Sequence, residues 1–247
     1  MRFLNFFLIL FLFNQPNFAK ANSLISGISN NEINIDTDFK GAQILLFGAK
    51  NDVGNIVVAV RGPQKNFIVS KKEKLFGIWY NGQRVIFKES FGFYSLFSTF
   101  NRGEMLASDL VDYELGRNNI KFKTTENIPV DQLKEFRVQL IELLEKKKYY
   151  RADVKKIDFL DETLFKLTID FPKNIILGTY IVEIYLINNG TVLSYQAIPI
   201  YVNQVGVNAT IANFAANQKV LYGIVAVFLA VIVGFITNYF FIKFIKK

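Results

Sequence analysis

The sequence contains no cysteine and no histidine. Without cysteine, no disulfide can hold the chain together, so its body must fold on a hydrophobic core alone. The two absences also exclude thiol chemistry, zinc sites built on cysteine or histidine, and catalytic triads with imidazole as the base. Carboxylates, lysines and tyrosines remain, but none stand at a diagnostic spacing. We therefore expect a protein that is not an enzyme, with no catalytic residues, no metal site and no cofactor.

Charge is missing from two stretches, one near each end of the chain. The first, residues 3–13, is apolar, follows Arg2 and precedes the small-residue pattern of residues 19–21. It is too short to cross a hydrocarbon core of about 30 Å at a rise of about 1.5 Å per residue. This arrangement predicts a signal peptide over residues 1–21. An uncleaved anchor is the alternative.

The second uncharged stretch, residues 220–242, is long enough to span a bilayer with some tilt. Three lysines follow it at 243, 246 and 247, whereas one lysine precedes it at 219. Because positive residues favour the cytoplasmic side, residues 219–242 are predicted to form a transmembrane helix and residues 243–247 a cytoplasmic tail. We expect a single-pass protein of a bacterial inner membrane, with its body in the periplasm.

The net charge of +8 comes mostly from these two ends. Six of the 29 basic residues belong to them, which leaves 23 basic residues against 21 acidic ones in the body. A body so close to neutral lacks the basic surface that nucleic-acid binding requires, so we expect no nucleic-acid partner.

Short strand patterns fill the first part of the body. Apolar runs bounded by glycine occur at residues 42–47 and 55–60, and further strands are predicted at residues 66–70, 75–80, 83–88 and 91–98. Strand patterns resume after residue 150, at residues 155–160, 164–171, 179–187 and 192–202. Between the last two, Asn188-Asn189-Gly190 favours a tight reversal, because these residues tolerate positive φ.

Two helical patterns separate these groups of strands. Residues 104–115 and 131–148 place apolar residues on one face, with Gly116 as a stop for the first helix and Asp131 as a cap for the second. We expect the apolar stripes to pack on a sheet. The alternative is that they form a groove for a partner.

Together these patterns predict a mainly β fold class. We expect one immunoglobulin-like β-sandwich over residues 22–218 with a helical insertion at about 103–150, plus one C-terminal transmembrane helix. Two small β units separated by the helices are the alternative. The C-terminal strands alone would be short for an independent core without disulfides, which favours one sandwich.

Two sets of residues are candidate sites. Arg61, Lys71, Lys72 and Trp79 are predicted to form an anion-binding surface, because guanidinium and ammonium groups donate to oxyanions and indole can stack on a ligand. The alternative is a solvated strand face with Trp79 in the core. Small residues at Gly223, Ala226, Ala230 and Gly234 are predicted to form a helix-packing interface, because they let two helices approach closely in lipid.

Several short motifs resemble the alphaproteobacterial Putative transmembrane protein family. They are Phe47-Gly48-Ala49, Arg61-Gly62-Pro63, Lys71-Lys72-Glu73, Phe76-Gly77-Ile78-Trp79, Phe93-Tyr94, Phe171-Pro172 and Gly178-Thr179-Tyr180. The resemblance covers nearly the whole chain and implies a single-span protein. It also implies a multi-span permease as a partner, since genes for such permeases stand beside those of some members.

Two functional classes are consistent with the sequence. The first is a noncatalytic accessory or interaction subunit of a membrane transporter or envelope complex, with the membrane and a multi-span protein such as a permease as its partners. The second is a periplasmic binding module for a small anion, a sugar or an envelope polymer.

Overall fold

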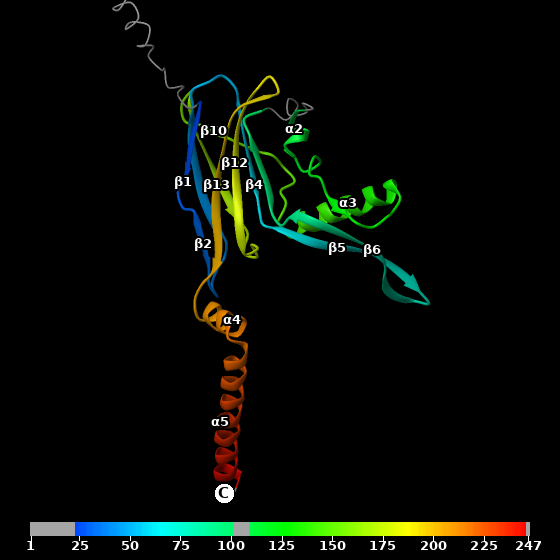
Figure 1. Ribbon diagram of the computed structural model, residues 1–247, viewed down its shortest axis with the longest axis vertical. Coiled ribbons are helices and arrows are strands. Elements are labelled where there is room, and N and C mark those ends of the chain that lie inside the picture. Colours follow the sequence, from blue (N-terminus) through cyan, green and yellow to red (C-terminus); the bar gives the residue numbers. More distant parts are fainter. Residues whose placement is uncertain (1–22, 101–108, 246–247) are drawn as a thin grey trace, which may run out of the picture.

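The computed structural model describes residues 23–100 and 109–245 of the chain, and these residues form a mainly β body followed by an apolar helix (Figure 1). The strands are β1 (Leu24–Ile28), β2 (Glu32–Ile35), β3 (Ala42–Lys50), β4 (Asn55–Arg61), β5 (Gln64–Leu75), β6 (Ile78–Phe91), β7 (Tyr94–Ser98), β8 (Lys123–Thr124), β9 (Lys155–Lys156), β10 (Asp158–Phe159), β11 (Leu164–Phe171), β12 (Gly178–Asn188) and β13 (Thr191–Gln204). The helices are α2 (Asp109–Asp112), α3 (Val130–Lys146), α4 (Val207–Asn217) and α5 (Lys219–Ile245).

Two sheets enclose the first hydrophobic core. One has four strands in the order β1-β3-β11-β10, and the other has six in the order β2-β13-β12-β4-β7-β9. Strands β3 and β11 alternate between buried and exposed residues, as strands do when one face lies on a core and the other faces solvent. Their inward side chains, such as Leu46 and Ile169, pack against Val58, Val182 and Ile200 of the six-stranded sheet.

Strand β4 is buried on both of its faces. Ile56, Val58 and Val60 point into the first core, whereas Val57 and Ala59 belong to a second core on the opposite side of the sheet. The second core is closed by α3 and by the three-stranded sheet β5-β6-β8. Because both faces of β4 are buried, its sequence is a continuous run of apolar residues.

The strands before and after the helical region interleave in the same sheets. Strand β3 pairs with β11 from Ala42↔Phe171 to Ala49↔Leu164, and β4 pairs with β12 from Asn55↔Ile187 to Arg61↔Ile181. The alternative of two separate β units is therefore wrong. The mainly β class and the C-terminal apolar helix are confirmed, while the immunoglobulin-like arrangement of the sandwich stays a prediction.

Both long hairpins turn on two residues with positive φ. Asn189 and Gly190 connect β12 to β13 with φ values of 47° and 79°, which confirms the predicted reversal. Phe76 and Gly77 connect β5 to β6 with φ values of 47° and 86°. The strand predicted over residues 75–80 is wrong, because these residues contain this turn and belong to two antiparallel strands.

The second predicted helix is α3, and its apolar face packs on the sheet as expected. Phe136, Leu140 and Leu144 are buried in the second core. The predicted cap at Asp131 is wrong. Pro129 is the N-cap residue, Asp131 lies in the first turn, and no side chain caps the start of the helix with a hydrogen bond. Of the first predicted helix, residues 104–108 lie outside the described residues, and the described part ends at Asp112.

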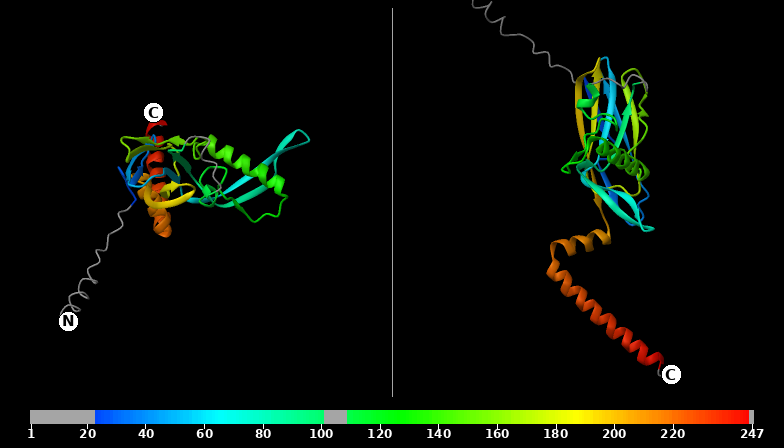
Figure 2. Two further views of the ribbon diagram at one scale, coloured as in Figure 1. Left: turned by 90° about the horizontal axis from the view of Figure 1, so that it is seen from above. Right: turned by 90° about the vertical axis from the view of Figure 1, so that its right-hand side faces the viewer.

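Helix α5 leaves the body through α4 and stands apart from it (Figures 1 and 2). Residues 219–243 have a mean hydropathy of 2.7 over the most apolar window, and that window is not buried against the protein. At about 1.5 Å per residue, this segment is longer than a hydrocarbon core of about 30 Å. Within the described residues, one helix is thus long and apolar enough to cross a membrane.

The predicted signal peptide, residues 1–21, lies outside the described residues.

Candidate functional site

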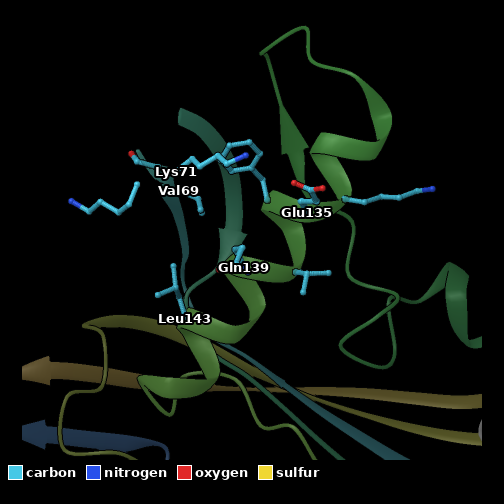
Figure 3. Close-up of a pocket in the computed structure, with 10 residues that line it drawn as sticks. Val69, Lys71, Glu135, Gln139 and Leu143 are labelled. Carbon is cyan, nitrogen blue, oxygen red and sulfur yellow. The ribbon is translucent and has the colours of Figure 1, made fainter. Parts of the chain in front are cut away.

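A groove runs between helix α3 and strand β5 (Figure 3). It forms because β5 is an edge strand of the three-stranded sheet, so among residues 23–100 and 109–245 no further strand lies between β5 and the helix. Val69 of β5 and Phe136 of α3 are both nearly buried at its floor, since they also belong to the second core. The core therefore fixes the spacing of the two walls.

The groove combines an apolar floor with a charged rim. Its volume is about 840 Å³, which lies within the range of about 300–1,000 Å³ found for ligand pockets. The residues that line it are Val69, Ser70, Lys71 and Lys72 from β5 and Lys134, Glu135, Phe136, Val138, Gln139 and Leu143 from α3. Val138 and Leu143 are about half exposed, so apolar surface is open to a binding partner.

The unpaired edge of β5 adds a second means of recognition. An edge strand presents free backbone N–H and C=O groups, and an extended peptide can pair with them while its side chains enter neighbouring pockets. On the β5 side the groove is lined by Val69, Ser70, Lys71 and Lys72, which belong to this edge strand. The geometry thus suits an extended segment as well as a small molecule.

The residues that were predicted to form an anion-binding surface do not all lie together in the structure. Lys71 and Lys72 line the groove, and Trp79 lies near the far end of the same hairpin, where it pairs with Lys74. Trp79 is 65% exposed, so its alternative placement in the core is wrong. Arg61 lies at the end of β4, next to the base of the hairpin.

Arg61 is held by groups inside the protein. Its Nη1 atom lies 2.5 Å from Oε2 of Glu183, with both side chains mostly buried, and its Nη2 donates to the carbonyl of Tyr113. Its guanidinium also lies 5.2 Å from the ring centre of Phe91. These contacts place Arg61 in a structural ion pair, away from the groove.

Tyrosines surround this ion pair and stay neutral over a wide pH range. The Tyr185 hydroxyl donates to Oε2 of Glu183 at 3.1 Å, and burial followed by the Glu183 charge raises the pKa of Tyr185. Burial likewise raises the pKa of Tyr94 to about 12, and its oxygen accepts a bond from the Gly116 N–H at 2.7 Å. Neutral phenols suit hydrogen bonding here, because an ionised phenol would sit in a poorly solvated place.

The tip of the β5–β6 hairpin carries large side chains that contact little of the body. Leu75, Phe76, Ile78 and Trp79 are all exposed. Tyr80 donates to Oε2 of Glu73 at 2.5 Å, and this hydrogen bond raises the pKa of Tyr80. An exposed cluster of this kind marks an interaction site more often than a structural one.

No group of three or more acidic side chains that could hold a metal ion occurs within residues 23–100 and 109–245.

The predicted helix-packing stripe lies on the exposed helix α5. Apart from the neighbouring backbone of α5 itself, a Cβ atom added at Gly223 or Gly234 would meet no described atom within 4 Å, and the helix is exposed from Lys219 to Lys243. The stripe therefore faces space that a second helix or lipid can occupy.

Comparison with protein families agrees with an exposed apolar helix on a β-rich body. A family model described as Putative transmembrane protein (Alph_Pro_TM) matches residues 23–243, which include both the sandwich and α5. The chain belongs to this family. The predicted resemblance is thereby confirmed, and membrane association follows from the family together with α5. A search of curated proteins gave no match.

Most residues of the groove and of the hairpin tip were not predicted from the sequence. Helical periodicity predicted which residues of α3 face a sheet, but it cannot show that the edge strand β5 lies beside the helix. The tip had a usable signal: Phe76-Gly77 stands between two alternating runs, and a glycine at the second position is typical of a two-residue hairpin turn.

Proposed function

We propose that this protein is a noncatalytic, membrane-anchored accessory subunit that binds a multi-span membrane protein such as a permease. Its body lies in the periplasm, α5 crosses the bacterial inner membrane once, and the C-terminus is cytoplasmic. The three lysines at 243, 246 and 247, against one at 219, support this orientation, since positive residues favour the cytoplasmic side.

The groove between α3 and β5 is the observation that carries the proposal. It offers exposed Val138 and Leu143 together with an unpaired strand edge, a combination suited to an extended segment of another protein. A body tethered beside a membrane protein by α5 meets such a segment at high effective concentration, which strengthens binding without new contacts.

Photo-crosslinking in intact membranes tests this proposal. A photoreactive residue placed at Val138 is expected to capture a multi-span membrane protein, because Val138 lies at the groove. The matched control is Val53, which is even more exposed but lies in the loop between β3 and β4. Equal capture of the same protein from both positions, or none from Val138, would contradict the groove as the binding surface.

The small residues of α5 support a second contact with the same partner. Replacing Ala226 and Ala230 by leucine is expected to reduce co-purification of the partner, because bulkier side chains keep helices apart. Val227 and Val231, on another side of the helix, give the control when they are replaced by leucine. Unchanged co-purification of both variants would argue against an interface at this stripe.

The alternative function is a binding module for a small anion, a sugar or an envelope polymer. The lysines on the rim of the groove, Lys71, Lys72 and Lys134, favour an anionic ligand. A thermal-shift screen of the full-length protein in detergent tests it. A rise in melting temperature that the substitution of Lys71 and Lys72 by glutamine abolishes would support this alternative, whereas a flat response across the panel would count against it.

A further inference from the structure

The tip of the β5–β6 hairpin exposes apolar surface that the fold does not need. Phe76 is 96% exposed, and Leu75, Ile78 and Trp79 around it are also exposed. Burial of such side chains elsewhere in the protein is what drives folding, so these residues contribute little to the stability of the body. Their exposure calls for a partner outside the body.

The turn itself argues that Phe76 serves an external role. Phe76 has φ 47°, the same value as Asn189 in the other hairpin, and each is followed by a glycine with positive φ. Asparagine is favoured in this left-handed conformation, whereas a bulky residue is an outlier there. The chain thus uses the locally preferred residue in one turn and a strained aromatic in the other.

The flanks of the tip are basic. Residues 71–80 contain Lys71, Lys72 and Lys74 but only one acidic residue, Glu73, which accepts the hydrogen bond from Tyr80. Lys74 Nζ lies 5.7 Å from the ring centre of Trp79. Aromatic rings next to lysines are typical of segments at the boundary between water and anionic lipid, where the ring sits at headgroup level and the ammonium meets phosphate.

The hairpin leaves the sandwich near the end that faces the membrane anchor. Its base follows Arg61, which pairs with Ile181, and Ile181 pairs in turn with Pro199 of β13. From Pro199, β13 runs on only to Gln204 before the chain enters α4, a rise of about 17 Å at about 3.3 Å per residue.

The β5–β6 hairpin is longer than this distance from Pro199 to the end of β13. The twelve residues of β5 extend about 40 Å at the same rise. Figures 1 and 2 show the hairpin slanting toward the end of the molecule where α4 and α5 begin, so that its tip lies at the level of α4. The bilayer that holds α5 is therefore the surface next to the tip.

We propose that the tip of the β5–β6 hairpin inserts into the headgroup region of the bilayer that α5 spans, with Phe76, Ile78 and Trp79 among the lipids and Lys71, Lys72 and Lys74 on anionic phosphates. The protein then contacts its membrane at two separated points. This second contact holds the groove between α3 and β5 at a fixed orientation above the bilayer.

The only tryptophan of the chain is Trp79, so its fluorescence reports on the tip alone. The full-length protein is reconstituted in phosphatidylcholine vesicles with and without phosphatidylglycerol, some carrying lipids brominated on the acyl chains. Insertion predicts a shift of the emission to shorter wavelength, quenching by the brominated lipids and protection from aqueous iodide, all stronger when phosphatidylglycerol is present. Emission typical of water-exposed indole, with full iodide quenching in every vesicle, would overturn the proposal.

Phe76→Asn is the sharpest variant, because it removes apolar surface while it places the residue of the Asn189 turn in the same conformation. We expect an unchanged or raised melting temperature and a loss of most of the lipid quenching, and the double variant Phe76→Asn/Ile78→Ser should lose it completely. Lys72→Gln/Lys74→Gln should remove the dependence on phosphatidylglycerol. Val53→Asn, in the exposed loop at the other end of β4, is the control and should change nothing.

Two outcomes would separate the bilayer from a protein partner. If Trp79 stays exposed to iodide in vesicles that hold only this protein, while a photoreactive residue at Phe76 captures another protein in native membranes, the tip binds a protein and the lipid proposal fails. If the lipid quenching persists in the double variant, the named side chains do not insert and the proposal also fails. Neither result depends on whether the groove captures a partner, so the proposed function is tested separately.

Discussion

Arg61 shows how a basic residue beside a possible site can belong to the framework instead. Its ion pair with Glu183 at 2.5 Å is mostly buried and is completed by the hydroxyl of Tyr185. A charge in such a place is tolerated because its partner lies next to it, and the loss of one member leaves the other charge poorly solvated.

We therefore expect Glu183→Ala to lower the free energy of unfolding by about 3 kcal/mol or more. The double variant Arg61→Met/Glu183→Leu should recover much of this loss, because no charge is then left unpaired. Denaturant or thermal unfolding of the full-length protein in detergent measures both.

The matched control is the exposed pair formed by Lys123 and Glu89 at 2.7 Å. Lys123→Ala should leave the free energy of unfolding nearly unchanged, since exposed ion pairs contribute little. A Glu183→Ala protein as stable as the Lys123→Ala protein would contradict the structural role assigned to the buried pair.

Helix α3 serves the body with one face and the groove with another. Leu140 is 2% exposed and packs in the second core, whereas Val138 on the groove side is 51% exposed. The same helix can therefore be changed on either face with opposite consequences for stability and binding.

Leu140→Ala is expected to destabilise the protein by about 2–5 kcal/mol, because it removes buried methyl groups and leaves a cavity. Val138→Ala should change stability by no more than about 0.5 kcal/mol, as for other exposed sites. Unfolding curves of the two variants make the comparison. Equal destabilisation would mean that the groove side of α3 is buried in solution.

At the scale of the whole molecule, α5 determines how the protein is held. Its length exceeds the hydrocarbon thickness, and its most apolar window is not buried against the protein. It contacts α4, where the rings of Phe214 and Tyr222 lie 5.9 Å apart. The body and the anchor are thus joined by a short connection, and the body carries both hydrophobic cores.

Deletion of residues 219–247 is expected to release the protein from membranes during an alkaline wash, because the hairpin tip alone buries too little apolar surface to resist it. Cell fractionation followed by immunoblotting gives the measurement. Replacement of residues 219–243 by an unrelated apolar helix of equal length should restore resistance to the wash. A truncated protein that still resists the wash would point to an uncleaved anchor at residues 1–21.

The local features of this protein were determined by its sequence. The uncharged run of residues 220–242, the alternation along residues 164–171 and the Asn189-Gly190 turn each depend on neighbours in the chain, and the structure confirms the helix, the strand and the turn. The family was also evident from short motifs spread over the chain, and the family model confirms it.

The site was decided only by the tertiary structure. The groove exists because α3 packs beside the edge of β5, some sixty residues earlier in the chain, and Arg61 is neutralised by Glu183, which is more distant still. Trp79 is exposed because its hairpin extends beyond the sandwich, a fact that no local pattern contains. Local periodicity says which residues form a strand or a helix, but the partner of each face follows from contacts between distant segments.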